Sequence, residues 1–214
     1  MKEYVVGKIK ANRYLTKQDI VVLLNTNQII LIKAFLPVSD PSKMYQALDR
    51  ICRSVLDDLE HSKIFSLRMA YGNLYTDFSK LKQSYEEAQS LIRLGAKFLN
   101  RNGLYTLDDL LVEQIAAALP PAAVDKILRP ILFALKRKDG TSDVELLHVA
   151  EVFVDEGLNL VRTAQKTFLH RNTIAAKIEK IRELTGLDPE SSFYHAFIIK
   201  LAAVYVRLSQ PGMK

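Results

Sequence analysis

The stretch 163-TAQKTFLHRNTIAAKIEKI-181 holds two helical patterns with almost no chain between them. They meet at Phe168-Leu169, so the sequence predicts a tight turn there rather than a long loop. A polar cluster, His170 to Thr173, stands in front of the second pattern. Apolar residues then recur at steps of four and three, which predicts a helix with one buried face. These residues are Ile174, Ile178, Ile181 and Leu184.

Helical patterns continue on both sides of this stretch and predict an all-helical unit. The expected helices span about 143–155, 160–167, 171–184 and 191–208. Asp143 and Asn159 are the expected N-caps, and Gly157 suits a left-handed turn at the end of the first helix. The side chains expected to face the core are Leu146, Leu147, Ala150, Phe153, Val154, Phe168, Leu169, Phe193, Phe197, Ile198, Leu201 and Val204.

A short helix, a tight turn and a following helix with polar groups at its start form the pattern of a helix-turn-helix. The start of the later helix enters the major groove, where arginine pairs with guanine and asparagine with adenine. The candidate DNA-contacting residues are Asn159, Thr163, Gln165, His170, Arg171, Asn172, Thr173 and Lys177. Arg171 and Asn172 are the expected base readers, while Asn159, Thr163 and the amides of the short helix are expected to hold phosphates. Any three-helix core would show the same stripe, so spacing alone leaves a purely structural role open.

Positive charge is concentrated on the same segment. The formal net charge of the chain is +6, which is common in proteins that bind no nucleic acid. Residues 162–182 hold six basic side chains and one acidic one, whereas residues 141–214 are balanced. The basic residues are Arg162, Lys166, Arg171, Lys177, Lys180 and Arg182. With the acids expected outside the segment, the pattern favours double-stranded DNA as partner, read by a homodimer with two heads about one DNA turn apart.

The first half of the chain is typical of a mixed α and β domain. Residues 19–35 predict two strands around a turn from Asn25 to Gln28, with both sides of the hairpin buried. Helices are expected from Pro41 and after Asp77. Further strands are expected at 64–72 and 104–106. The apolar stripes on the two helices are Met44, Leu48, Ile51, Val55 and Leu59, then Leu81, Tyr85, Ala88 and Ile92. Strands alternating with amphipathic helices predict a sheet covered by helices on at least one face.

From Leu107 onward the chain is expected to be helical. Two helices, over about 107–119 and 122–137, are split by Pro120-Pro121, and residues 138–142 form a polar linker with one glycine. We therefore expect three parts. These are an α/β domain at 1–106, bridging helices and linker at 107–140, and a helix-turn-helix domain at 141–214.

The composition argues against several classes of protein. No run of 18 apolar residues exists, so no membrane span is expected, and the first residues lack the apolar core of a signal peptide. The single cysteine, Cys52, cannot form an internal disulfide, which fits a reducing cytoplasm, and a packed thiol is expected there. No common nucleotide-binding, hydrolase or metalloprotease motif is present, and the histidines lack metal-ligand spacing. No enzyme, cofactor or metal site is therefore expected.

Residues 157–188 resemble the C-terminal helix-turn-helix of the CdaR/PucR family of bacterial transcriptional regulators. The matching residues are Asn159, His170-Arg171-Asn172-Thr173-Ile174 and Leu184-Thr185-Gly186-Leu187-Asp188. The same helical pair is similar to the factor for inversion stimulation. The resemblance implies a regulator that reads DNA with the helix starting near His170.

Two residues depart from the pattern of that family. Its members usually carry large polar side chains directly after the Thr-Leu pair, where this chain has Ala175 and Ala176. Lys177 keeps the next, usually basic, position. The departure implies a lower affinity for DNA, a changed sequence preference or only residual DNA binding.

Residues 67–95 and the preceding hairpin resemble the degenerate GGDEF-like domain of sugar diacid regulators of the CdaR type. The best-matching pieces are Tyr71-Gly72-Asn73 and Ser84-Tyr85-Glu86-Glu87-Ala88. The resemblance implies an α+β first half, with a partial cyclase-like sheet and helices, followed by an all-α helix-turn-helix domain. It also implies a regulator of carbohydrate diacid utilization whose effector, a small molecule, is bound by an N-terminal domain outside these 214 residues.

The hairpin turn differs from that of an active diguanylate cyclase. Asn25-Thr26-Asn27-Gln28 offers neither an acid for Mg²⁺ nor a glycine pair for close approach to GTP, so a catalytically inactive domain is expected. Two alternatives stay open from the sequence. The first half could be a nucleotide-binding or cyclase-like enzyme module, or it could be a dimerisation or signal-relay module beside a domain with residual DNA binding.

Overall fold

The computed structural model describes residues 2–25, 27–36, 40–62, 67–137, 140 and 143–209. The chain forms two compact units, Met1–Leu110 and Leu111–Lys214. The first unit combines helices with short strands, and the regular structure of the second unit, in its described residues, is helical apart from an isolated bridge residue at Lys136. The predicted fold class, an α+β half followed by an all-α half, is therefore confirmed. The finer division at 106 and 140 stays a prediction.

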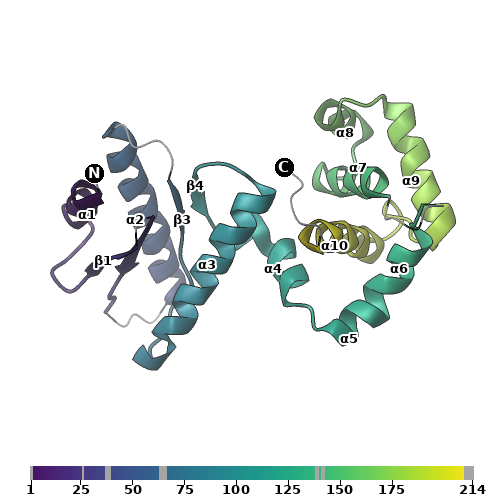
Figure 1. The fold of residues 1–214 in the computed structure, drawn as a ribbon. Coiled ribbons are helices and arrows are strands. Elements are labelled where there is room, and N and C mark those ends of the chain that lie inside the picture. The colour runs from purple at the N-terminus through teal and green to yellow at the C-terminus, as the bar shows by residue number, and fades with distance from the viewer. Residues whose placement is uncertain are drawn as a thin grey trace. The chain divides into compact units, whose positions relative to one another are not determined.

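The first unit contains the predicted hairpin, both predicted helices and two further short strands (Figure 1). It also has an N-terminal helix, α1, that the sequence patterns did not indicate. Its elements are α1 (Lys2–Lys10), β1 (Ile20–Asn25), β2 (Gln28–Ile32), α2 (Pro41–His61), β3 (Arg68–Ala70), η1 (Phe78–Lys80), α3 (Leu81–Phe98), β4 (Gly103–Tyr105) and η2 (Asp108–Leu110). Of the strand expected at 64–72, residues 64–66 lie outside the described residues.

Strands β1 and β2 pair antiparallel, with Ile20 opposite Ile32 and Val22 opposite Ile30. Only one side of this hairpin packs on the helices. Val21, Ile29 and Leu31 contact the core formed by α1 and α2, where Asp40 caps α2 as Pro41 opens it. The prediction that both sides are buried was wrong, because no described helix covers the other side and β1 is largely exposed. Alternation along a strand assigns neighbouring residues to opposite sides, and hydrophobicity alone did not reveal which side is open.

Strands β3 and β4 form a separate parallel pair that lies between α2 and α3. Leu104 packs with Cys52 and Leu56 of α2. The ring of Tyr105 lies against Gly95 of α3, where an added Cβ would come within 2.4 Å of the ring. The predicted single sheet is therefore two small sheets in the described residues. The stripe expected on α3 is only partly buried, because its C-terminal half carries the contact with β4 through Leu91, Leu94 and Gly95.

The second unit follows the predicted series of helices. Its elements are α4 (Leu111–Ala118), α5 (Pro121–Ala123), the π-helical segment η3 (Val124–Leu128), α6 (Arg129–Ala134), α7 (Val144–Asp155), α8 (Leu160–Thr167), α9 (Arg171–Thr185) and α10 (Phe193–Ser209). The predicted break at Pro120-Pro121 is confirmed, and α4 packs on α10 within this unit. Of the predicted linker, only Gly140 lies within the described residues, with φ of 82°.

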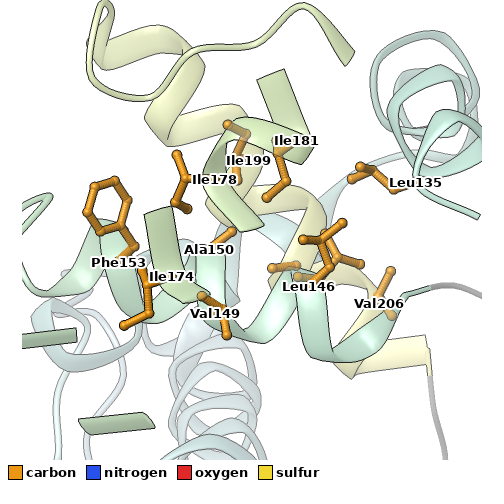
Figure 2. Packing of buried hydrophobic residues seen from close by; sticks show 12 residues of the cluster. Leu135, Leu146, Val149, Ala150, Phe153, Ile174, Ile178, Ile181, Ile199 and Val206 are labelled. Carbon is orange, nitrogen blue, oxygen red and sulfur yellow. The ribbon is translucent and has the colours of Figure 1, made fainter. Parts of the chain in front are cut away.

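Buried side chains from α7, α9 and α10 form the core of the second unit. Figure 2 shows this cluster, with Phe153 and Ala150 of α7 near Ile174 and Ile178 of α9. The predicted apolar stripe of α9 is confirmed for Ile174, Ile178 and Ile181, all buried. Leu184, Phe168 and Phe193 were wrongly expected in the core, since all three are exposed. Each lies at the end of a helix or in a turn, where the helical period no longer sets the direction of the side chain.

Candidate DNA-binding surface

Helices α8 and α9 are joined by a turn that backbone geometry and caps define closely. Asn159 caps α8, since its Oδ1 accepts hydrogen bonds from the N–H groups of Val161 and Arg162 at 3.0 and 3.1 Å. Phe168 ends α8 in the left-handed conformation, with φ of 56° and ψ of 27°. His170 then caps α9, since its Nδ1 accepts from the Asn172 N–H at 3.2 Å. The predicted short helix, tight turn and second helix are confirmed.

The start of α9 presents an exposed polar row. His170, Arg171, Asn172 and Thr173 are all exposed, and Gln165 is exposed on α8. The opposite side of α9 is held in the core by its three isoleucines. Ala175 and Ala176 are also exposed, so the surface of α9 directly after Thr173 carries only short side chains. The structure thus leaves six of the eight predicted contact residues exposed, four of them consecutive at the start of α9.

Thr163 is the one predicted contact residue that is fully buried. Its side chain is fully buried, and its hydroxyl donates to the Asn159 carbonyl oxygen at 2.8 Å. The hydroxyl therefore stabilises the first turn of α8 instead of facing solvent. The structure separates Thr163 from the exposed row, and a phosphate would have to be held by other groups on α8.

Ion pairs neutralise much of the basic segment. Lys177 pairs with Glu145 at 2.9 Å, and Lys180 pairs with Asp143 at 3.3 Å, so both lysines tie α9 to the start of α7. Lys166 and Arg182 also have acidic partners, which are Glu156, Glu179 and Asp188. Along the chain the segment holds one acid, Glu179, but the expectation that the other acids lie apart from it was wrong in space. Among the described residues, Arg162 and Arg171 are the members of this basic group without an acidic partner.

Asp143 is the acid that anchors this arrangement. It caps α7 through the Leu146 N–H and receives hydrogen bonds from Arg137 at 2.9 Å and Lys180 at 3.3 Å. Burial alone would raise the pKa of Asp143, but the bonds from Arg137, Lys180 and a backbone N–H outweigh burial and hold that pKa below its ordinary value. The ionised carboxylate therefore stabilises the folded state.

Replacing Asp143 with asparagine should lower the free energy of unfolding by about 1–2 kcal/mol at neutral pH, because the cap survives while the charge is lost. A lowered folded-state pKa gives stability that is full above the unfolded pKa of about 3.9 and is lost as the pH falls through the folded value. Urea unfolding at a series of pH values should show the two proteins converging in acid. Asp125→Asn, at an exposed pair with Arg129, is the control, and a pH-independent difference for Asp143→Asn would contradict this account.

Phe168 lies on the protein surface, although the sequence predicted it in the core. The residue is 94% exposed and lies two positions before His170, the first residue of the polar row. A non-glycine residue in the left-handed region is uncommon and turns its side chain away from the path of the helix. The available signal was the junction itself, since a turn this tight between two helices commonly requires a left-handed residue.

The first unit contains a buried thiol and an open hollow with charged walls. Cys52 is buried, and burial raises the pKa of its thiol to about 12, so the predicted packed thiol is confirmed. An open hollow of about 750 Å³ carries cations and anions in equal number; its charged lining residues are Arg13, Arg50, Arg53, Asp49, Asp57 and Asp108. Arg53 already pairs with Asp49 at 2.7 Å. Within the described residues, no group of three or more His, Cys, Asp or Glu side chains is arranged to hold a metal ion.

A capped short helix, a left-handed turn and a second helix with an exposed polar start define a protein of the helix-turn-helix class. The PucR C-terminal helix-turn-helix domain matches residues 146–203, and a GGDEF-like domain matches residues 9–94. The chain therefore belongs to the PucR/CdaR family of transcriptional regulators.

Three relatives show what the chain is similar to. The proline-responsive transcriptional activator PutR of Bacillus subtilis is 26% identical over 78% of this chain and 41% of that protein. The carbohydrate diacid regulator of Escherichia coli is 22% identical over 80% of this chain and 44% of that protein. The DNA-binding transcriptional activator AdeR of Bacillus subtilis is 26% identical over 81% and 42%. The chain thus spans less than half the length of these relatives.

A solved structure, the regulator of polyketide synthase expression from Bifidobacterium adolescentis, is similar at a TM-score of 0.35 and 14% identity, over 98% of this chain and 75% of that chain. In the part of the chain that the structure describes, no helix is both long and apolar enough to cross a membrane.

Proposed function

We propose that this chain is a DNA-binding module of a transcriptional regulator and reads DNA with the start of α9. The observation that carries the proposal is the exposed polar row His170 to Thr173 at the start of a helix whose isoleucines are buried in the core. The core fixes the rotation of α9, and that rotation turns the polar row outward. Family membership supports the same role, since the relatives named above are transcriptional regulators.

The contacts divide into base readers and phosphate holders. The side chains of Asn172 and Arg171 are exposed, so the Asn172 amide can meet an adenine edge and Arg171 can pair with a guanine. The Val161 and Arg162 N–H groups are already bonded to Asn159, so these amides are not available to a phosphate. We therefore assign phosphate binding on α8 to the side chains of Arg162 and Gln165.

Because the side chains of Ala175 and Ala176 are short, base contacts should come mainly from the first turn of α9. Lys177 is engaged by Glu145, so its contribution to DNA binding has to compete with that ion pair. The DNA-sequence specificity of one helix-turn-helix should therefore rest on few base contacts. Binding of two of them to a roughly palindromic site would supply the further contacts that one lacks. A homodimer belongs to this proposal.

Two finer assignments have narrower support. Regulation of carbohydrate diacid genes is supported by the similarity to the carbohydrate diacid regulator, at 22% identity. Absence of enzyme activity in the GGDEF-like domain is supported by the turn Asn25 to Gln28, which has no acid, and by relatives that are transcriptional regulators. Incubation with GTP and Mg²⁺ tests the second assignment, and nucleotide turnover would overturn it.

The salt dependence of DNA binding tests the proposal as a whole. The affinity for a mixed-sequence duplex, followed by fluorescence anisotropy, should fall steeply between about 50 and about 200 mM salt, because each neutralised phosphate adds about −0.9 to the log–log slope. Selection from a random duplex pool would then reveal a preferred sequence. A flat salt response, or a selected pool without any preference, would refute DNA reading by this chain.

A further inference from the structure

Two lysines on one side of α9 are held by carboxylates at the start of α7. Thr173, Lys177 and Lys180 follow one another at steps of four and three, so they line the same side of the helix. Thr173 is the last residue of the exposed polar row. Lys177 pairs with Glu145 at 2.9 Å, and Lys180 pairs with Asp143 at 3.3 Å. The side of α9 that continues from Thr173 is therefore basic, but its charges are already engaged within the chain.

The two acids differ in what else they do. Asp143 caps α7 and also binds Arg137, so it holds the fold as well as a lysine. Glu145 lies in the first turn of α7 with a side chain that is 60% exposed, and its ion-pair partner is Lys177. The Lys177 side chain is only 21% exposed, so this lysine is largely covered while it is paired. Glu145 can therefore lose its charge without loss of a helix cap, and the main consequence falls on Lys177.

The Glu145 carboxylate and a DNA phosphate are rival partners for the Lys177 ammonium group. Both are oxyanions that accept charge-assisted hydrogen bonds from a lysine. A phosphate beside the pair would also meet the negative charge of Glu145, and like charges repel. Because Lys177 lies one helical turn after Thr173 on the same side of α9, a duplex bound at the polar row comes close to this pair. Binding of that duplex is therefore linked to release of Lys177 from Glu145.

We propose that Glu145 is an intramolecular competitor of DNA, which lowers the DNA affinity of this chain by occupying Lys177. The inference rests on the proposed function and adds a control to it. An ion pair with one exposed partner is weak, so the contact reduces affinity without preventing binding. The start of α7 thereby sets how strongly α9 binds DNA, although α7 itself need not touch the duplex.

Glu145→Gln tests the competition. Glutamine keeps the length of the side chain and removes its charge at an exposed position, so the fold should be retained, which circular dichroism verifies. In anisotropy titrations with a mixed-sequence duplex, the variant should bind about two- to fivefold more tightly than wild type, which matches the strength of exposed ion pairs. Glu183→Gln is the matched control. It removes the same charge from an exposed residue of α9 that has no basic partner among the described residues, and its affinity should stay close to that of wild type.

A double-mutant cycle shows whether Glu145 acts through Lys177. Lys177→Gln should weaken DNA binding, and adding Glu145→Gln to it should bring no gain, because no ammonium group is left to release. An equal gain with and without Lys177, or an equal gain from Glu183→Gln, would reveal a general effect of net charge and overturn the inference. DNA binding with unchanged affinity in Glu145→Gln would overturn the competition alone, whereas absence of DNA binding in wild type and Glu145→Gln would overturn the proposed function as well.

Discussion

Replacing Ile174 with alanine should lower the free energy of unfolding of the helix-turn-helix unit by about 2–5 kcal/mol. Ile174 is fully buried and belongs to the cluster that joins α7, α9 and α10. Alanine removes three carbon atoms from a site with no solvent access, so the loss combines the transfer free energy with that of the cavity left behind. Urea unfolding followed by circular dichroism measures the change.

The matched control is the neighbouring residue on the same helix. Thr173 is exposed, so Thr173→Ala should change the free energy of unfolding by no more than about 0.5 kcal/mol. The two variants differ by one position along α9 and by the side of the helix that they alter. Equal effects of the two substitutions would contradict the assigned rotation of α9, and the proposed reading surface would lose its basis.

The same pair of variants separates folding from recognition. Ile174→Ala should leave the DNA affinity of the folded fraction unchanged at low temperature, since its side chain points away from the proposed groove surface. Thr173→Ala should leave stability unchanged and alter DNA binding. One variant should change stability alone and the other DNA binding alone, because one side of α9 lies in the core and the other faces solvent. This comparison tests the role of α9 without knowledge of the operator sequence.

Hydrophobic periodicity explains how much of the second unit was accessible from sequence. The caps Asp143 and Asn159, the turn at Gly157 and the isoleucine stripe each follow from local chemistry, and the structure has them where they were expected. Local chemistry does not specify contacts between distant segments. The pairing of Lys177 with Glu145 joins residues 32 positions apart (177 less 145), so the neutralisation of the basic segment was invisible in the chain.

The first unit shows a different limit. An aliphatic run predicts a strand with two apolar sides, but it does not say whether a helix of the same chain covers both. The β1–β2 hairpin has a cover on one side, whereas Tyr105 and Leu104 of β4 have one on each. Sequence therefore indicated the strand and its hydrophobicity, and only the packing revealed which hairpin residues meet the helices. The same limit applies to Phe168, whose apolar character predicted burial although its turn conformation exposes it.

Replacing Arg171 with alanine should weaken binding to the selected DNA sequence roughly tenfold to a hundredfold, because one bidentate pair with guanine contributes about 1–3 kcal/mol. Arg171 stands at the first position of α9, is exposed and has no acidic partner among the described residues. Its guanidinium therefore reaches DNA without first breaking an ion pair, unlike Lys177. Anisotropy titrations against the selected duplex, and against the same duplex with the guanine changed, measure the loss.

Comparing the affinities for the two duplexes distinguishes a base contact of Arg171 from a phosphate contact. If it reads a base, Arg171→Ala should bind both duplexes alike while wild type prefers one; if it holds a phosphate, both affinities fall together and the log–log salt slope changes by about one unit. Arg93→Ala removes an exposed arginine of the first unit and should change neither. Asn172→Ala should lose the preference at one neighbouring base pair, since its exposed side-chain amide can pair with an adenine. Wild-type affinity in Arg171→Ala would mean that the polar row does not face DNA, because no other exposed cation stands at the start of α9 among the residues described.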